Sequence, residues 1–253
     1  MTALERPYWI EAQFQRREGW DAAVYPFNLP AVRSLHSLEF HPNVTFLVGE
    51  NGSGKSTLIE ALAVAWGFNA EGGSKNFSFG TRGSHSPLHA FVRPVRAPLR
   101  PIDGYFLRAE SYFNVASEIE RLDEEPSGGP PIIDSYGGKS LHEQSHGESF
   151  FALFENRFRG DGLYILDEPE AALSPSRQLS FLARMHELVL ARSQLIIATH
   201  SPILLGYPNA WIYQVSRIGL DRIAYEDTDH YQVTRNFLNR RAMMLEVLLK
   251  PDD

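Results

Sequence analysis

The segment GENGSGKST, residues 49–57, constrains the fold of this chain more than any other feature of the sequence. It follows the apolar run at 46–48 and precedes the helical pattern LIEALAVAW, so that a strand leads into a glycine-rich loop and a helix leaves it. The glycines let backbone N–H groups wrap around an anion, and the start of the following helix adds a positive dipole end. The segment therefore predicts a phosphate-binding loop between a buried strand and a helix.

Most positions of this loop have an expected role in binding a nucleotide. Lys55 is expected to reach the β- and γ-phosphates, and the Ser56 hydroxyl is placed for Mg²⁺. The residues predicted to hold the nucleotide are Gly49, Asn51, Gly52, Ser53, Gly54, Lys55, Ser56 and Thr57.

Two further polar clusters follow apolar runs that have the length of buried strands. The run at 163–166 leads into Asp167 and Glu168, and the run at 195–198 leads into Thr199 and His200. In a chain with a phosphate loop, Asp167 is expected to serve the metal, while Glu168 orients and deprotonates an attacking water. His200, at the end of a neighbouring parallel strand, is expected to donate to a γ-phosphate oxygen. These residues predict hydrolysis of a nucleoside triphosphate.

The rest of the chain fits one α/β domain over residues 1–253. Apolar runs predict strands at 44–48, 105–107, 163–166 and 195–198, and helical spacing occurs at 57–66, 150–158, 178–190 and 234–249. This alternation favours a largely parallel sheet, with residues 110–160 as a mostly helical insertion. Segments 69–87, 93–101 and 123–131 are rich in Gly, Pro or Ser and are predicted to be loops.

Composition narrows the class of protein. Cysteine is absent, which excludes disulfides and cysteine-based metal sites. There is no membrane-spanning apolar stretch, and the N-terminal residues are too charged for a signal peptide, so a cytoplasmic protein is expected. The net charge of −7 argues against a protein that coats nucleic acid, although segment 75–108 has a local net charge of +5. That segment is either a solvated basic edge or a contact for an anionic partner such as nucleic acid.

The order of these motifs resembles the ABC-type ATPase superfamily. GENGSGKST is followed by SHGES at 145–149, LYILDEPE at 163–170, ALSP at 172–175 and ATHS at 198–201, and the resemblance runs from about residue 40 to 203. The segment DEPEAALSP is more similar to stand-alone ATPases related to the RecF, OLD and structural-maintenance-of-chromosomes groups. The resemblance implies a P-loop NTPase with a largely parallel core sheet, a β-rich lobe and an inserted helical subdomain. It implies ATP and Mg²⁺ as ligands.

The resemblance also implies an ATP-dependent homodimer whose two copies pair head to tail. Each ATP would lie between the phosphate loop of one copy and the signature segment of the other, where Ser145 and Gly147 contact the γ-phosphate. Ser145 with Glu148 also fits a helix-capping box, and the two roles are compatible.

Two positions depart from the family pattern. Arg108 or Glu110 stands where the family has a glutamine for the metal and the attacking water, and an arginine cannot bind a metal ion. The aromatic residue that stacks on adenine is Tyr25, Phe27 or neither, since both also suit an apolar core.

Three functions are compatible with this sequence. The leading one is an ATPase that opens and closes as a dimer and switches an effector protein or a nucleic acid. The second is the ATPase subunit of a membrane transporter whose membrane partner is a separate chain. The third is a nucleotide sensor with negligible turnover, suggested by the missing glutamine.

Overall fold

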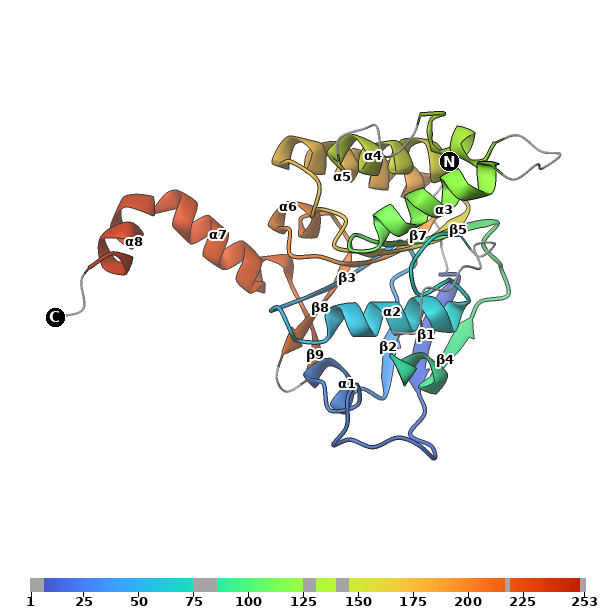
Figure 1. The fold of residues 1–253 in the computed structure, drawn as a ribbon. Helices are drawn as coiled ribbons and strands as arrows, with labels where there is room; N and C mark the ends of the chain where they lie inside the picture. Colours follow the sequence, from blue (N-terminus) through green and yellow to red (C-terminus); the bar gives the residue numbers. More distant parts are fainter. Residues whose placement is uncertain (1–6, 75–85, 125–130, 140–145, 217–218, 251–253) are drawn as a thin grey trace.

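The computed structural model describes residues 7–74, 86–124, 131–139, 146–216 and 219–250. Its centre is a six-stranded sheet in the order β5-β6-β7-β3-β8-β9 (Figure 1). The strands are β3 (Val44–Gly49), β5 (Asp103–Arg108), β6 (Gly162–Asp167), β7 (Gln194–Ala198), β8 (Trp211–Ser216) and β9 (Gly219–Ile223). Five of them are parallel, and β9 pairs antiparallel with β8 at one edge. The predicted fold class, an α/β P-loop NTPase with a largely parallel sheet, is therefore confirmed.

The central strands form because most of their residues, on both faces, are apolar. All six residues of β3 and of β6 are buried, as are all five of β7. Continuous apolar strands of this kind are stable in a parallel sheet that helices cover on both sides. The four strands predicted from apolar runs are all present, each slightly longer than predicted.

A second, smaller sheet is antiparallel and has the order β2-β1-β4. It consists of β1 (Trp9–Phe14), β2 (Ser37–Glu39) and β4 (Val92–Arg96). The prediction of a loop over 93–101 is wrong for its first four residues, which belong to β4. Pro94 made this segment resemble a loop, but β4 is an edge strand, where one side needs no ladder hydrogen bond and a proline is tolerated.

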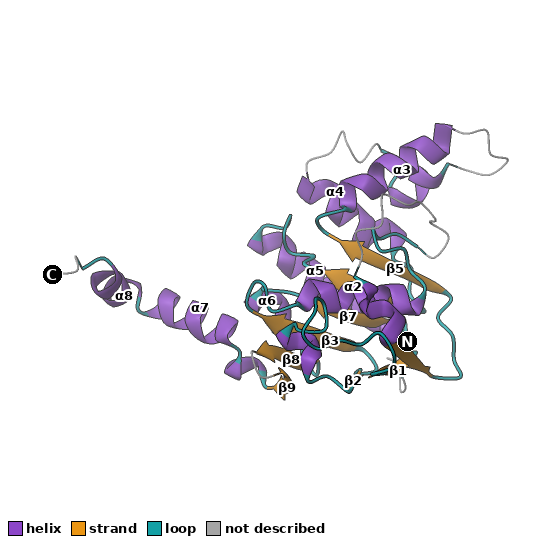
Figure 2. Cartoon of the chain, turned by 60° about the horizontal axis from the view of Figure 1, so that its bottom comes forward, coloured by secondary structure: helices purple, strands orange, loops and turns teal. Residues whose placement is uncertain are grey.

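Helices cover both faces of the six-stranded sheet (Figures 1 and 2). Leu47 of β3 packs in the cluster that contains α2 (Lys55–Trp66) and the small sheet, whereas Phe46 and Val48 pack on the opposite face. That opposite face is covered by α3 (Tyr112–Glu124), α4 (His146–Ala152), α5 (Pro175–Leu190) and α6 (Pro202–Leu205). The alternation of side chains along one strand thus separates two apolar cores.

The described elements between β5 and β6 are helical. They are α3, a 3₁₀ turn η2 (Ile132–Tyr136), α4 and a π-helical turn η3 (Leu153–Arg157). The helix predicted over 150–158 therefore begins earlier, at His146, and its second half is the wider π-helical turn η3. Within that turn Arg157 forms an ion pair with Asp103 at 2.9 Å, which ties the helical segment to the start of β5.

The C-terminal helices α7 (Asp229–Asn239) and α8 (Arg241–Leu248) project away from the body as an arm (Figures 1 and 2). The prediction of one helix over 234–249 is wrong at two points. Thr228 caps α7 and starts it five residues earlier, and Arg240, with φ −130° and ψ 31°, separates the two helices. No helix in the described ranges is both long and apolar enough to cross a membrane.

Candidate active site

The carboxyl ends of the parallel strands bring the predicted residues to one edge of the sheet. The phosphate loop follows β3, Asp167 ends β6, and Thr199 and His200 follow β7, which lies between β3 and β6. Asp167 is in register with Ala198, and the Thr199 N–H donates to the Leu47 carbonyl at 3.1 Å. In open α/β sheets this edge is where ligands bind.

The start of α2 differs from the starts of α5, α6 and α7, the other helices near these strand ends. Ser174, Ser201 and Thr228 cap α5, α6 and α7 with their side-chain oxygens. At α2 the N-cap is Gly54, in the left-handed region at φ +96°, and no described side chain caps the helix. The first turn of α2 also contains no acidic residue. Its N–H groups are therefore available to an anion, which the positive end of the helix dipole favours.

Lys55 lies folded into the loop, with only 4% of its surface exposed. Its Nζ donates to the Gly49 carbonyl at 2.7 Å and to the Glu50 carbonyl at 2.9 Å. Burial lowers the pKa of Lys55, and the negative charges of Glu168 and Asp167 oppose that shift. An ammonium group held only by carbonyls gains from a phosphate, because a charge-assisted hydrogen bond is stronger than a neutral one.

Ser56 and Asp167 form a hydroxyl–carboxylate pair beside the loop. The Ser56 Oγ donates to Asp167 Oδ1 at 3.4 Å, and Asp167 is 5% exposed. Burial and the charge of Glu168 raise the pKa of Asp167 to about 7, against the opposing effect of Arg108. Oxygen ligands of this kind fit Mg²⁺, and a divalent cation here would compensate the buried carboxylates.

Glu168 and His200 face each other at the ends of neighbouring strands. Glu168 has φ +51°, a left-handed conformation that is strained for a residue other than glycine. Its Oε1 lies 3.4 Å from the Nε2 of His200, and 39% of its side chain is exposed. Burial, followed by the positive charge of Lys55, lowers the pKa of His200, so its imidazole is neutral near pH 7. The pair combines a partly exposed carboxylate on a strained backbone with a neutral ring.

Two residues at this site had no role in the sequence-based prediction. Glu170 accepts a hydrogen bond from the His200 N–H through its Oε1 at 2.6 Å, and burial raises its pKa. His230, in the first turn of α7, places its Nε2 3.0 Å from the Nδ1 of His200. Glu170 could have been suspected from its place in DEPE, whereas nothing in the sequence around His230 indicated contact with a residue 30 positions earlier.

The two candidates for the missing glutamine have different surroundings. Arg108, in register with Asp167, forms an ion pair with Glu60 of α2 at 2.6 Å. It also contacts Glu110 at 3.3 Å, and the Glu110 side chain is 82% exposed. The phosphate-loop helix therefore holds Arg108 through Glu60. Of the two candidates for the missing glutamine, Glu110 has the more exposed side chain.

The aromatic candidates for adenine stacking also differ. Phe27 is 4% exposed and packs against Trp20 and Phe91, so it belongs to the core. Tyr25 is 57% exposed, and its hydroxyl lies 3.3 Å from the Oγ1 of Thr57 in the first turn of α2. Tyr25 is the aromatic side chain of the two that a nucleotide at the loop can reach.

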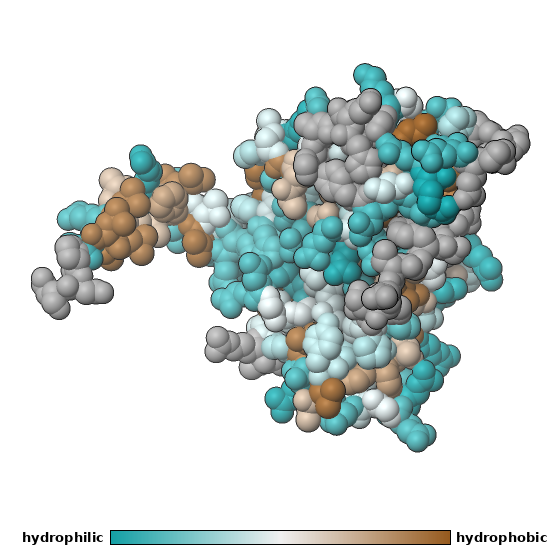
Figure 3. Space-filling model, viewed as in Figure 1, coloured by the Kyte–Doolittle hydropathy of each residue, from teal (hydrophilic) through white to brown (hydrophobic). Residues whose placement is uncertain are grey.

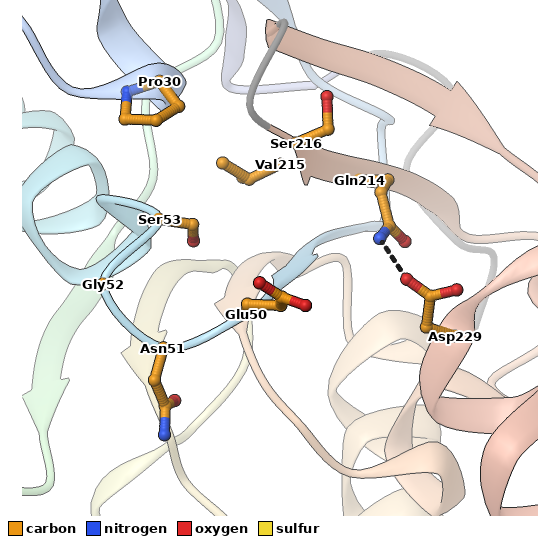
Figure 4. Close-up of a pocket in the computed structure, with 9 residues that line it drawn as sticks. All are labelled: Pro30, Glu50, Asn51, Gly52, Ser53, Gln214, Val215, Ser216 and Asp229. Atoms are coloured by element: carbon orange, nitrogen blue, oxygen red, sulfur yellow. Dashed lines mark hydrogen bonds between the residues drawn. The ribbon is translucent and has the colours of Figure 1, made fainter.

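A polar cavity of about 450 Å³ adjoins the loop on the side of β8 (Figure 4). Residues 50–53 of the loop form one wall, and Gln214 and Asp229 stand opposite, joined by a hydrogen bond of 3.2 Å. Pro30, Val215 and Ser216 complete the lining. This cavity connects the phosphate loop with the first turn of α7.

The predicted signature segment is only partly described. Ser145 lies outside the described residues, and Gly147 lies in the first turn of α4. Because α4 packs on the face of the sheet opposite to α2, the two helix starts belong to different sides of the sheet. The structure therefore does not bring Gly147 to the phosphate loop of its own chain.

A strand–glycine loop–helix unit, followed by an acidic pair and a histidine at the ends of adjacent parallel strands, is the arrangement of a P-loop NTPase. Two family models match the chain: one described as "AAA domain" over residues 28–121, and one described as "AAA domain, putative AbiEii toxin, Type IV TA system" over residues 140–206. The two matched segments are therefore similar to P-loop ATPase domains, which bind ATP. No curated protein sequence matches it.

Similar solved structures include cbiO1 from Clostridium perfringens, part of the ABC transporter complex cbiONQ. It is 15% identical, and the match covers 95% of this chain and 99% of that one with a TM-score of 0.49. Another is the SMC head domain from Thermotoga maritima, which is 17% identical, with 74% and 92% covered and a TM-score of 0.38.

Proposed function

We propose that this protein hydrolyses ATP and that two copies close head to tail around two Mg²⁺-bound ATP molecules, acting as a switch on an effector protein or a nucleic acid. The observation that carries the proposal is the convergence of Lys55, Asp167, Glu168 and His200 at three adjacent strand ends. These side chains supply a cation, a metal ligand, a carboxylate base and a hydrogen-bond donor in one place.

Each of these side chains has a role that follows from its surroundings. Lys55 and the uncapped N–H groups of α2 bind the phosphates, while Ser56 and Asp167 hold Mg²⁺. The metal, when bound, neutralises developing charge on the phosphate oxygens. Glu168, whose side chain is 39% exposed at the strand ends, can contact the attacking water and is the base that accepts its proton. Neutral His200 donates through Nε2 to a γ-phosphate oxygen.

In this proposal a second copy completes the site, because α4, which contains Gly147, packs on the face of the sheet opposite to α2. Gly147 packs so closely on the loop after Glu168 that a Cβ there would lie 2.9 Å from the Ala172 carbonyl. Arg177 of α5 donates to the Gly147 carbonyl at 3.2 Å. The start of α4 and the segment 172–175 thus form one surface, which we assign to the face that meets the partner copy. In this proposal the helical segment 110–160 is the subdomain that presents Ser145 and Gly147.

The decisive test is the Glu168→Gln variant in a sedimentation and turnover experiment. It should bind ATP with Mg²⁺, hydrolyse it at least about 100-fold more slowly than wild type, and accumulate as a dimer. Glu187→Gln, on the exposed face of α5, is the matched control and should behave as wild type. An unchanged hydrolysis rate in Glu168→Gln would refute the assignment of the base. A wild type that binds ATP without turnover would identify a nucleotide sensor instead.

A nucleic-acid partner would require a basic contact surface in segment 75–108. Lys75 and Arg82 lie outside the described residues, Arg96 stacks on Trp66 at 4.4 Å, and Arg93 and Arg100 are exposed. Replacing Arg93 and Arg100 with Glu should therefore abolish salt-dependent DNA binding by the Glu168→Gln dimer. DNA binding that survives this change would mean that Arg93 and Arg100 are not the contact, whereas no DNA binding at all would leave a protein effector as the target of the switch.

A further inference from the structure

His230 connects the predicted γ-phosphate sensor to the C-terminal arm. The Nε2 of His230 lies 3.0 Å from the Nδ1 of His200, and the two ring centroids are 5.2 Å apart. Both rings are half-buried. Because His200 Nε2 faces Glu168, the two nitrogen atoms of His200 have separate partners, one at the reaction site and one on α7.

Other contacts fix the first turn of α7 to the same strand ends. Thr228 is fully buried; its Oγ1 accepts from the Tyr231 N–H at 3.2 Å and donates to the Tyr225 carbonyl at 2.8 Å. The Tyr225 hydroxyl donates to the Pro202 carbonyl, two residues after His200, at 2.8 Å. Asp229 accepts from Gln214 beside the phosphate loop (Figure 4). The base of the arm therefore touches the segment after β7, through Pro202, and strand β8, through Gln214.

The rest of the arm has little to hold it in one orientation. Every residue of α7 and α8 is at least partly exposed, and the arm appears in Figure 3 as an apolar projection beside the body. Its large exposed apolar side chains are Val233, Leu238, Met243, Val247, Leu248 and Leu249. The 11 residues of α7 extend about 16 Å, so a small rotation at the base moves the distal apolar side chains by several ångströms.

The hydrogen bond between the two histidines has two possible directions. Either His230 donates from Nε2 and His200 carries its own hydrogen on Nε2, or His200 donates from Nδ1 and its Nε2 is a bare lone pair. A γ-phosphate oxygen is only an acceptor, so it selects the first direction. Without His230 as donor, His200 is free to rotate or to adopt the tautomer that cannot bind the phosphate.

We propose that His230 is a positioning residue for γ-phosphate recognition, and that the His200–His230 contact couples the bound nucleotide to the orientation of the C-terminal arm. This inference rests on the proposed function, in which His200 contacts the γ-phosphate. Coupling of this kind is reciprocal: a phosphate that orders His200 also favours one position of α7, and a fixed α7 strengthens binding of the phosphate.

The first test compares a nucleotide that has a γ-phosphate with one that lacks it. In His230→Phe, which keeps a ring but removes the donor, Mg²⁺-AMPPNP should bind about 3- to 10-fold more weakly, as expected for one lost hydrogen bond. ADP affinity should stay within about twofold, because ADP has no γ-phosphate. His230→Gln restores a donor and should recover most of the difference. Asn236→Ala, exposed on the same helix, is the control and should change neither affinity.

The second test measures the arm itself. Because the chain has no cysteine, Cys introduced at Asn239 on α7 and Glu187 on α5 are the only sites for spin labels. In labelled protein diluted with unlabelled protein, AMPPNP should shift or narrow the distance distribution relative to ADP. His230→Phe should abolish that difference.

The outcomes distinguish a failure of the proposed function from a failure of the role proposed for His230. If wild type binds neither nucleotide, the proposed function itself is wrong. If wild type binds both but His230→Phe weakens ADP and AMPPNP equally, or weakens neither, His230 has no specific role toward the γ-phosphate. If the arm distances are the same with both nucleotides, the coupling to the arm is refuted even when the affinities change as expected.

Discussion

Replacing Asp167 with Asn should make the nucleotide-free protein more stable, although it removes a predicted metal ligand. Burial and the charge of Glu168 raise the pKa of Asp167 from 3.8 to about 7. Since the carboxylate has a higher pKa in the folded protein than in the unfolded chain, its ionisation favours unfolding. The destabilisation is absent below the unfolded pKa, grows as the pH rises from about 4 to 7, and is complete above 7.

The size of the stability difference follows from the pKa shift of Asp167. A difference of about 3 pKa units corresponds to about 4 kcal/mol at pH 8, and linkage leaves about 2 kcal/mol at pH 5. Asn is neutral at every pH and has nearly the same shape. For a chain of this size, 4 kcal/mol corresponds to a rise in melting temperature of about 10 °C. Asp167→Asn should therefore melt higher than wild type at pH 8, with a clearly smaller difference at pH 5.

Thermal unfolding in the absence of nucleotide and Mg²⁺ is the assay. Asp103→Asn is the control: Asp103 lies at the opposite end of β5 in an ion pair with Arg157, so its neutralisation should lower the melting temperature. Mg²⁺ with AMPPNP should stabilise wild type but not Asp167→Asn. The reasoning is refuted if Asp167→Asn is no more stable than wild type at pH 8, or if its advantage does not grow with pH.

Three further changes test contacts within the fold, two beside the site and one at the start of β3. Gly49→Ala should lower the free energy of unfolding, measured with urea, by about 3 kcal/mol, because the new Cβ would lie 2.5 Å from the Val215 carbonyl oxygen. An unchanged urea midpoint would contradict that close approach. Glu60→Ala should lower the free energy of unfolding by about 2 kcal/mol in the same assay, because it removes the carboxylate 2.6 Å from Arg108, whose side chain is only 24% exposed. An unchanged free energy of unfolding would mean that water replaces the ion pair. Burial lowers the pKa of His41, whose Nδ1 accepts two backbone N–H groups, so stability is lost as the pH falls below about 6.5. The melting temperature of His41→Asn should accordingly fall less between pH 7.5 and 5.5 than that of wild type, and parallel falls would exclude this role.

The central parallel strands could be predicted because their signal is local. Strands β3, β6 and β7 are continuous apolar runs, and each is followed at once by the polar residues of the site. The strands β8 and β9 have mixed burial patterns, and β1 has no clean alternation, so their sequences alone did not indicate strands. Such strands depend on pairing with a neighbour, as β9 does on β8, and this information is not local in the sequence.

The same distinction holds for the site. Lys55, Asp167 and His200 each follow an apolar strand, so each could be proposed from its own segment, and the structure brings them to one edge. The contacts of His200 with Glu170 and with His230 each join residues 30 positions apart. The first depends on the turn after β6 and the second on the cap at Thr228, and neither geometry can be read from spacing.

Burial acts against the charge of several ionisable groups at these strand ends at once. It lowers the pKa of Lys55 and raises those of Asp167 and Glu170, so each group is less favourably charged here than in water. A phosphate alone would stabilise Lys55 but repel the carboxylates, and a divalent cation alone would have the opposite effects. Only a ligand that brings a polyanion and a cation together compensates both sets of charges. Magnesium-bound nucleotide has this property, and its binding free energy would also stabilise the fold.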